Sequence, residues 1–177
     1  IYKHHFMPLT FSVETPKELV FESISEYLHR LNLTVDKQDN TRPWGGFFVI
    51  DETLSEKFIE IYFPHLTKEA LSISGKLSPK ILVVAPEKRL SWQYHHRRAE
   101  IWKLIGGKAQ VVTSDNDIEK ETTKLNVGDI VQLKQGQRHR LVGLDGWGVV
   151  AEIWQHTDAE NPSNEDDIVR VQDDFGR

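Results

Sequence analysis

The stretch SWQYHHRRAEIW, residues 91–102, decides the fold. Gln93 and His95 are separated by one residue, so on a β-strand their side chains point to the same face of the sheet. Four residues then separate His95 from Glu100, a gap that suits a short reversal with Glu100 at the beginning of the next strand. We therefore expect two paired strands that carry an amide, an imidazole and a carboxylate close together.

A second histidine, His139, lies further along the chain in GQRHRL, after the turn Gly128-Asp129 and a short apolar run. Each of these polar residues alone would be read as a solvated side chain, but together they form a mixed set of nitrogen and oxygen ligands. Gln93, His95, Glu100 and His139 suit a divalent metal, with coordination positions left for substrate oxygens. We expect zinc, with manganese, iron, cobalt and nickel as alternatives.

Short segments rich in β-branched and aromatic residues continue around this stretch, separated by turn signals. Little helix is expected after residue 75, and Gly106-Gly107 is predicted to form a hairpin turn. The sequence therefore predicts an all-β antiparallel sandwich or barrel. The expected strands are FFVID (47–51), FIEIYF (58–63), KILVV (80–84), EIWKLI (100–105), KAQVVT (108–113), DIVQL (129–133), WGVVAEIW (147–154) and a terminal strand in 168–177.

One helix is expected, over residues 15–32. Its apolar positions, which recur at three- and four-residue spacing, are Leu19, Ile24, Tyr27, Leu28 and Leu31. We interpret it as a helix that packs on the main body, and we expect a short helical turn within residues 65–72.

Length and charge restrict the class of protein. The 177 residues suit one domain, and a net charge of −5, from 22 basic and 27 acidic residues, argues against a nucleic-acid-binding surface. The absence of cysteine excludes disulfides and thiolate metal sites and suits a cytoplasmic protein. No apolar run approaches the ~20 residues of a membrane span, and the start IYKHHFMPLTF lacks a secretory layout. His4 and His5 are not expected to bind metal.

The two-part motif QxHxxxxE and GDIVQLKQGQRH resembles the metal signature of cupins, with glutamine in place of the usual first histidine. More narrowly, four segments resemble the C-terminal isomerase domain of type II phosphomannose isomerases, which are often fused to mannose-1-phosphate guanylyltransferases. They are RPWGGFFVID (42–51), RLSWQYHHRRAEIW (89–102), GDIVQLKQGQRHRL (128–141) and EDDIVRVQDDFGR (165–177).

The resemblance implies a cupin jelly-roll β-barrel over residues 41–177, preceded by an N-terminal extension with one helix over residues 1–40. It implies a metal-dependent aldose–ketose isomerase that acts on a sugar phosphate, mannose 6-phosphate or fructose 6-phosphate, through an enediolate. It also implies a homodimer. Guanylyl transfer is not expected, because these residues contain no glycine-rich nucleotide loop. A sugar-phosphate-binding cupin without turnover, and another cupin metalloenzyme such as a dioxygenase, are the alternatives.

The phosphate of such a substrate requires fixed positive charge. Arg98 would lie on the same face as Glu100, and Lys80 and Arg89 are further candidates. Arg170, in EDDIVR, matches the family motif and is our preferred pocket arginine.

The group that transfers the proton is expected to be Glu152, which alternates with apolar residues in WGVVAEIW, with His96 as the other option. Trp44 and Trp102 could line the sugar pocket, although a core position is the more common role of such a residue.

Three departures from the family pattern are expected to reshape the pocket. Arg97 stands where the family usually has a third consecutive histidine, Ile101 where it has another histidine, and Lys134 where it has proline.

Overall fold

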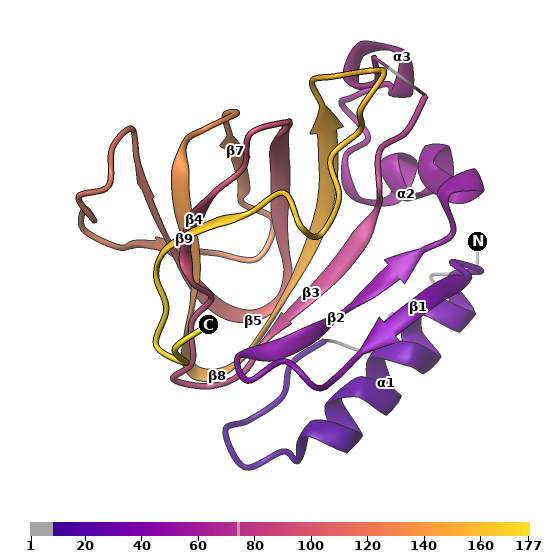
Figure 1. The fold of residues 1–177 in the computed structure, drawn as a ribbon. Coiled ribbons are helices and arrows are strands. Elements are labelled where there is room, and N and C mark those ends of the chain that lie inside the picture. Colours follow the sequence, from indigo (N-terminus) through magenta and orange to yellow (C-terminus); the bar gives the residue numbers. More distant parts are fainter. Residues whose placement is uncertain (1–8, 74) are drawn as a thin grey trace.

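The structure of the protein, a computed structural model, describes residues 9–73 and 75–177, and its strands form one curled β-sheet (Figure 1). The strands pair antiparallel throughout. In chain order they are β1 (Val35–Asp39), β2 (Gly45–Ile50), β3 (Lys80–Val84), β4 (Trp92–Tyr94), β5 (Arg98–Ser114), β6 (Thr123–Leu125), β7 (Ile130–Leu133), β8 (Arg138–His156) and β9 (Val169–Gln172).

Two long strands, β5 and β8, organise the barrel. They pair with each other from Arg98↔His156 to Ser114↔Arg138, and β8 also pairs with β3 and β4. The sheet runs in the order β1-β2-β3-β8-β4-β9, and β5 carries β6 and β7 beside β8. This arrangement is a cupin β-barrel, so the expected fold class is confirmed.

The hairpin expected at Gly106-Gly107 is wrong, because these glycines lie inside the continuous strand β5. The pairing register with β8 shifts on both sides of them, which marks a bulged bend. Gly107 has φ 73°, and a Cβ atom there would lie 1.8 Å from the carbonyl oxygen of Trp147. The glycine pair thus allows a long strand to bend around the barrel. Because adjacent glycines also occur in hairpin turns, the sequence alone does not distinguish the two structures.

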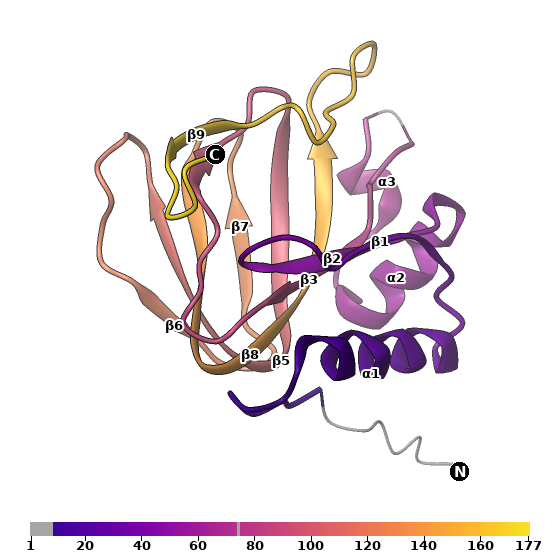
Figure 2. The same ribbon diagram turned by 60° about the horizontal axis from the view of Figure 1, so that its bottom comes forward.

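The helices lie on one side of the barrel, as both views show (Figures 1 and 2). They are α1 (Lys17–Arg30), η1 (Glu52–Leu54), α2 (Ser55–Tyr62) and α3 (Lys68–Leu71). The strand expected at FIEIYF is therefore wrong. Phe58, Ile59 and Tyr62 have a helical i, i+1, i+4 spacing, and all three are buried. The short helical turn expected within residues 65–72 is confirmed by α3.

Helix α1 lies where the apolar pattern predicted it, but its buried face is rotated. Val20, Phe21, Ile24 and Leu28 are buried, whereas Leu19 is 51% exposed. Residues 1–40 contribute more than a helix, because β1 pairs with β2 in the same sheet. The predicted boundary at residue 41 thus falls in the connection between two paired strands. His4 and His5 lie outside the described residues.

Apolar side chains are buried on both faces of the sheet. One cluster lies between the helices and the sheet, and includes Phe21, Phe48, Phe58 and Ile101. The other fills the inside of the barrel, and includes Trp44, Trp102, Leu133 and Leu141. Because successive residues of a strand point to opposite faces, Ile101 and Trp102 belong to different clusters. Polar residues that alternate in the same way therefore point into the barrel.

The C-terminal segment, residues 157–177, crosses from the end of β8 to the opposite side of the barrel (yellow in Figures 1 and 2). It contains β9, which pairs with β4. Within the described residues, no helix is long and apolar enough to cross a membrane.

Candidate metal centre and pocket

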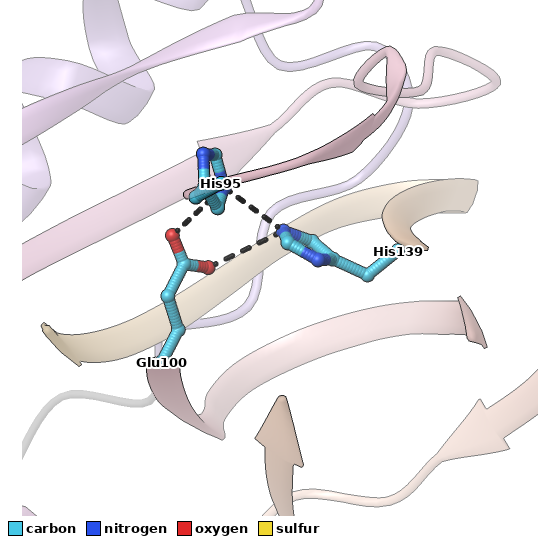
Figure 3. Close-up of side chains that lie close together, drawn as sticks. All are labelled: His95, Glu100 and His139. Atoms are coloured by element: carbon cyan, nitrogen blue, oxygen red, sulfur yellow. Dashed lines mark hydrogen bonds and ion pairs between the residues drawn. The ribbon is translucent and has the colours of Figure 1, made fainter. Parts of the chain in front are cut away.

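Three buried side chains from separate segments of the chain converge inside the barrel (Figure 3). His95 follows β4, Glu100 lies near the start of β5, and His139 lies near the start of β8. The Nε2 atom of His95 lies 3.3 Å from Nε2 of His139 and 3.2 Å from Oε1 of Glu100. Nε2 of His139 lies 3.4 Å from Oε2 of Glu100. All three ligand atoms thus fall within 4.8 Å of one another.

Backbone carbonyls fix the orientation of both imidazole rings. Nδ1 of His95 lies 2.7 Å from the carbonyl oxygen of Asp167, and Nδ1 of His139 lies 3.0 Å from that of Gln137. A carbonyl oxygen only accepts hydrogen bonds, so each Nδ1 carries the proton and each Nε2 presents a lone pair. Two lone pairs and a carboxylate therefore face one another.

This arrangement fits a cation. Burial opposes the ionisation of Glu100, but the guanidinium charge of Arg98, which donates to Oε1 at 2.8 Å, outweighs that effect and holds the pKa of the carboxyl group well below its usual range. Its Oε2 atom is buried and has no hydrogen-bond partner among the described residues, because Nε2 of His139 has no proton to donate. A divalent ion would satisfy the orphaned oxygen and both Nε2 atoms together.

Arg98 contacts two of the three residues of this centre, Glu100 and His95. Its Nε donates to Oε1 of Glu100 at 2.8 Å, and its NH2 approaches Nε2 of His95 at 3.3 Å. The same guanidinium donates to Oγ of Ser163 at 2.8 Å and stacks 3.6 Å above the ring of Trp154. Protein groups therefore occupy most of its donors, and we interpret Arg98 as a residue that positions Glu100 rather than as a phosphate ligand.

Gln93 lies on the strand next to His139. The two residues are direct partners in the pairing of β4 with β8, and Gln93 is 8% exposed. Its Oε1 atom accepts a hydrogen bond from Oγ of Ser91 at 2.6 Å. Its role as a fourth metal ligand stays a prediction.

A pocket of about 350 Å³ opens beside the three convergent side chains. This volume is in the range of small-molecule sites. Its wall combines aromatic rings with charged groups of both signs. The lining residues are Arg42, Trp44, Phe47, Lys80, Leu82, Leu90, Gln93, Arg98, Glu100, Trp102, Glu152, Trp154, Glu165, Asp166, Ile168, Arg170 and Arg177.

Glu152 projects into this pocket from β8 and is 4% exposed. The indole nitrogen of Trp102 donates to one carboxylate oxygen at 2.6 Å, and that of Trp154 donates to the other at 2.8 Å. Burial, and then the nearby Glu100 carboxylate, raise the pKa of Glu152 well above its usual range. Trp102 thus lines the pocket and is buried at the same time, as is Trp44.

The remaining predicted pocket cations have different environments. Lys80 is buried, forms an ion pair with Glu165 and lies 4.0 Å from the ring centroid of Trp154. Arg170 lines the pocket from β9. Arg89 does not line it and instead pairs with Asp174 at 2.6 Å.

The three departures from the family pattern lie away from the pocket wall, and their effect on the pocket stays a prediction. Ile101 is buried in the cluster between helices and sheet, on the opposite face of β5 from Glu100. Lys134 is exposed, and Arg97 lies beside Asp167. None of the three lines the pocket, nor does His96, the alternative proton-transfer group.

Sequence reasoning missed Asp167, although it lies in the quoted segment EDDIVR. Its carboxylate accepts hydrogen bonds from the backbone amides of His96 and Arg97 at 2.9 and 3.0 Å and from Oγ of Ser163 at 2.6 Å. The carboxylate thus anchors the carbonyl that orients His95. The pair of adjacent aspartates in a segment otherwise rich in solvated charge is the only available sequence signal.

Comparisons with known proteins agree with this geometry. The family model described as "Mannose-6-phosphate isomerase C-terminal" matches residues 51–173. Alginate biosynthesis protein AlgA of Pseudomonas aeruginosa is 29% identical over 126 residues, which cover 70% of this chain and 24% of AlgA. Mannose-1-phosphate guanylyltransferase of Escherichia coli is 30% identical over 118 residues, which cover 67% of this chain and 23% of that protein. The chain spans about a quarter of the length of these relatives.

Solved structures with a similar fold are more distant. A structure from work on the DMSP lyases RdDddP and RnDddQII has a TM-score of 0.52 at 12% identity and covers 86% of this chain and 70% of its own. The capsular polysaccharide assembling protein CapF of Staphylococcus aureus has a TM-score of 0.52 at 14% identity, over 87% of this chain and 37% of its own. These likenesses concern the fold alone.

Proposed function

Because this chain belongs to the family of mannose-6-phosphate isomerase C-terminal domains, we propose that it is a metal-dependent aldose–ketose isomerase acting on a sugar phosphate. Mannose 6-phosphate and fructose 6-phosphate are the proposed substrate pair. The observation that carries the proposal is the convergence of His95, Glu100 and His139 beside a pocket that Glu100 and the protonatable carboxyl group of Glu152 both line.

His95, Glu100 and His139 are the residues that would hold the metal, with Gln93 as the proposed fourth ligand. When bound there, a divalent ion supplies Lewis acidity that polarises a substrate carbonyl and the oxygen next to it. Two neutral imidazoles, a neutral amide and one carboxylate leave a divalent centre with net positive charge. Zinc suits this donor set, as do the other divalent transition metals.

Glu152 is the proposed proton-transfer group. In the aldose-to-ketose direction its carboxylate takes the proton from C2 and returns it to C1, while the proton of the C2 hydroxyl moves to the oxygen on C1. A base works best when its pKa lies near the working pH, and burial shifts Glu152 in that direction. Trp102 and Trp154 hold the carboxylate in place through their indole N–H groups.

A coupled assay for fructose 6-phosphate formation from mannose 6-phosphate tests the proposal. It is run on protein as purified, after chelator treatment, and after return of single metals with metal analysis of each sample. We expect turnover that chelation abolishes and a divalent metal restores. Binding of the sugar phosphate without turnover under every metal would instead favour a non-catalytic binding module.

Substitutions test whether the activity depends on the proposed metal ligands. His139→Ala and Gln93→Ala should lose metal and activity together, whereas Arg170→Ala should keep its metal and lose activity at substrate concentrations below the KM of the unmodified protein. His65→Ala removes an exposed histidine distant in sequence from the proposed ligands and is the matched control. Full metal content in both His139→Ala and Gln93→Ala would show that the ligand assignment is wrong.

A further inference from the structure

Three arginines from two distant parts of the chain line the more exposed part of the pocket. Arg42 lies in the connection between β1 and β2, Arg170 lies in β9, and Arg177 lies beyond it. In contrast, the charged groups nearest the metal centre are buried, among them Arg98 and Glu152. The pocket thus has a cationic region separate from the convergent histidines.

Arg170 differs from the other basic residues of the pocket. Within residues 9–73 and 75–177, its side chain forms no ion pair and no hydrogen bond with another side chain or the backbone. The other four basic side chains each have a carboxylate partner, in the pairs Arg42–Asp39, Lys80–Glu165, Arg98–Glu100 and Arg177–Asp173.

The charges of the three arginines act on one another. Burial and then the positive charges of Arg177 and Arg42 lower the pKa of Arg170, and Asp173 offsets this only in part. Guanidinium groups that repel one another around a pocket favour the binding of an anion, because an anion between them offsets their electrostatic repulsion.

Two of these arginines are held in place with donors left over. Arg42 donates only its Nε–H to Asp39, at 3.1 Å, so both terminal nitrogens of its guanidinium group have no partner among the described residues. Asp173 accepts from Nε and NH2 of Arg177 at 2.7 and 3.3 Å, which leaves NH1. Planar guanidinium groups that are already oriented lose little freedom when they bind a tetrahedral anion.

We propose that Arg42, Arg170 and Arg177 form the site that binds the phosphate monoester of the substrate. Arg170 pairs with Gln93 across β9 and β4, and Gln93 pairs with His139 across β4 and β8. Two strand spacings, or about 10 Å, therefore separate the backbone of Arg170 from that of His139. A sugar chain fits between a phosphate at the arginines and a carbonyl at the metal centre. This inference rests on the proposed function for the identity of the molecule that carries the phosphate.

A bound phosphate would also join two segments of the protein. Arg170 and Arg177 belong to the C-terminal segment, whereas Arg42 belongs to the β1–β2 connection. The anion would therefore hold the C-terminal segment against the barrel while the sugar is bound. Inorganic phosphate should then slow backbone amide exchange in residues 168–177 of the metal-loaded protein.

Calorimetric titration with inorganic phosphate tests the site without any need for turnover. The metal-loaded protein is titrated at low ionic strength, and the titration is repeated after chelation so that metal-bound phosphate is recognised. Arg42→Met and Arg170→Met should each weaken phosphate binding at least 10-fold in both states. Arg89→Met, which removes an arginine paired with Asp174 outside the pocket, should stay within 2-fold. Unchanged affinity in Arg42→Met and Arg170→Met would overturn the inference.

The double variant shows whether the two arginines share one anion. If they do, the unmodified protein binds one phosphate per chain at the arginines, each single substitution weakens that one binding event, and Arg42→Met/Arg170→Met binds more weakly than either single variant. Two phosphates bound per chain in the chelated protein, with one of them lost in each single variant, would place the two residues at separate anion sites and would contradict the inference. Unfolding curves of every variant show whether a loss of affinity reflects loss of fold.

Kinetics separate this inference from the proposed function. Arg42→Met should raise KM for mannose 6-phosphate at least 10-fold with kcat within about 3-fold, because it removes binding that ground state and transition state share. No turnover in the unmodified protein, together with arginine-dependent phosphate binding, would refute the isomerase and leave the anion site. Turnover in the unmodified protein, together with an unchanged KM in Arg42→Met, would support the isomerase and refute the anion site.

Discussion

The backbone carbonyl of Asp167 accepts a hydrogen bond from Nδ1 of His95 at 2.7 Å, across 72 positions of the chain. The C-terminal segment that closes over the barrel therefore sets the orientation of a proposed metal ligand. The same residue uses its carboxylate to hold the turn at His96 and Arg97. The metal centre and the segment that covers the pocket are thus coupled through one residue.

Asp167→Asn should weaken metal binding roughly 10- to 100-fold, because an amide cannot accept all three hydrogen bonds that anchor the segment. Competition with a metal-indicator dye measures the affinity. Asp166→Asn changes the neighbouring exposed aspartate and should bind metal as the unmodified protein does. Equal affinities of the two variants would show that the anchor has no effect on His95.

The Asp167 carboxylate should also make the free energy of unfolding depend on pH in the acid range. Burial opposes the ionisation of Asp167, but hydrogen bonds from Ser163, His96 and Arg97 bring its pKa down to about 2. Because the folded pKa is below the unfolded value, the carboxylate stabilises the fold above about pH 4, and this stabilisation disappears as the pH falls toward 2. It amounts to about 2 kcal/mol.

Urea unfolding of the unmodified protein and Asp167→Asn between pH 7 and pH 3 measures this contribution. The difference in free energy of unfolding should shrink as the pH falls. A difference that stays constant over this range would show that the carboxylate contributes nothing through its charge.

Glu152 should have the opposite effect on stability. Burial and the Glu100 carboxylate raise its pKa to about 8, so the chelated protein should lose stability as the pH rises from about 4.5 through 8. The expected loss is on the order of a few kcal/mol. Glu152→Gln should remove this pH dependence, keep its metal and lose turnover, and thermal unfolding at a series of pH values follows it. A Glu152→Gln variant with full activity would exclude Glu152 as the proton-transfer group.

Metal removal should destabilise the protein only where the metal binds. At a free metal concentration 1,000 times the dissociation constant, binding contributes about 4 kcal/mol to the free energy of unfolding. Chelator should therefore lower the midpoint of thermal unfolding of the unmodified protein and leave that of His139→Ala unchanged. A similar chelator-induced decrease in both proteins would place the ion elsewhere.

The helical side of the fold can be tested independently of the site. Phe58 is fully buried in the cluster between helices and sheet and stacks edge-on against Tyr62 at 4.8 Å. Phe58→Ala should cost about 3–5 kcal/mol, because it leaves a cavity in a packed core. Ile118→Ala, at a position 68% exposed, should cost less than about 0.5 kcal/mol. Urea unfolding compares the two variants.

Local patterns account for much of what could be predicted. The β-branched residues of KILVV and WGVVAEIW favour strands, and the 3.6-residue periodicity of α1 is equally local. The spacing of His95 and Glu100 indicated a reversal between consecutive strands, which β4 and β5 are. The expectation that these two strands pair with each other is wrong, because each pairs with β8 instead. These signals lie within a few residues, so one sequence suffices to detect them.

Long-range packing decided the rest. FIEIYF forms a helix because Phe58 and Tyr62 pack in the core between the helices and the sheet. Gly106-Gly107 bends a strand because β8 lies alongside it. The orientation of His95 by Asp167 and the gathering of Arg42 with Arg170 depend on segments more than 70 residues apart. The sequence by itself determined which residues are chemically able to bind a cation and an anion. Only the tertiary structure decided which of them meet, because strand pairing, not proximity in the chain, sets the distances between them.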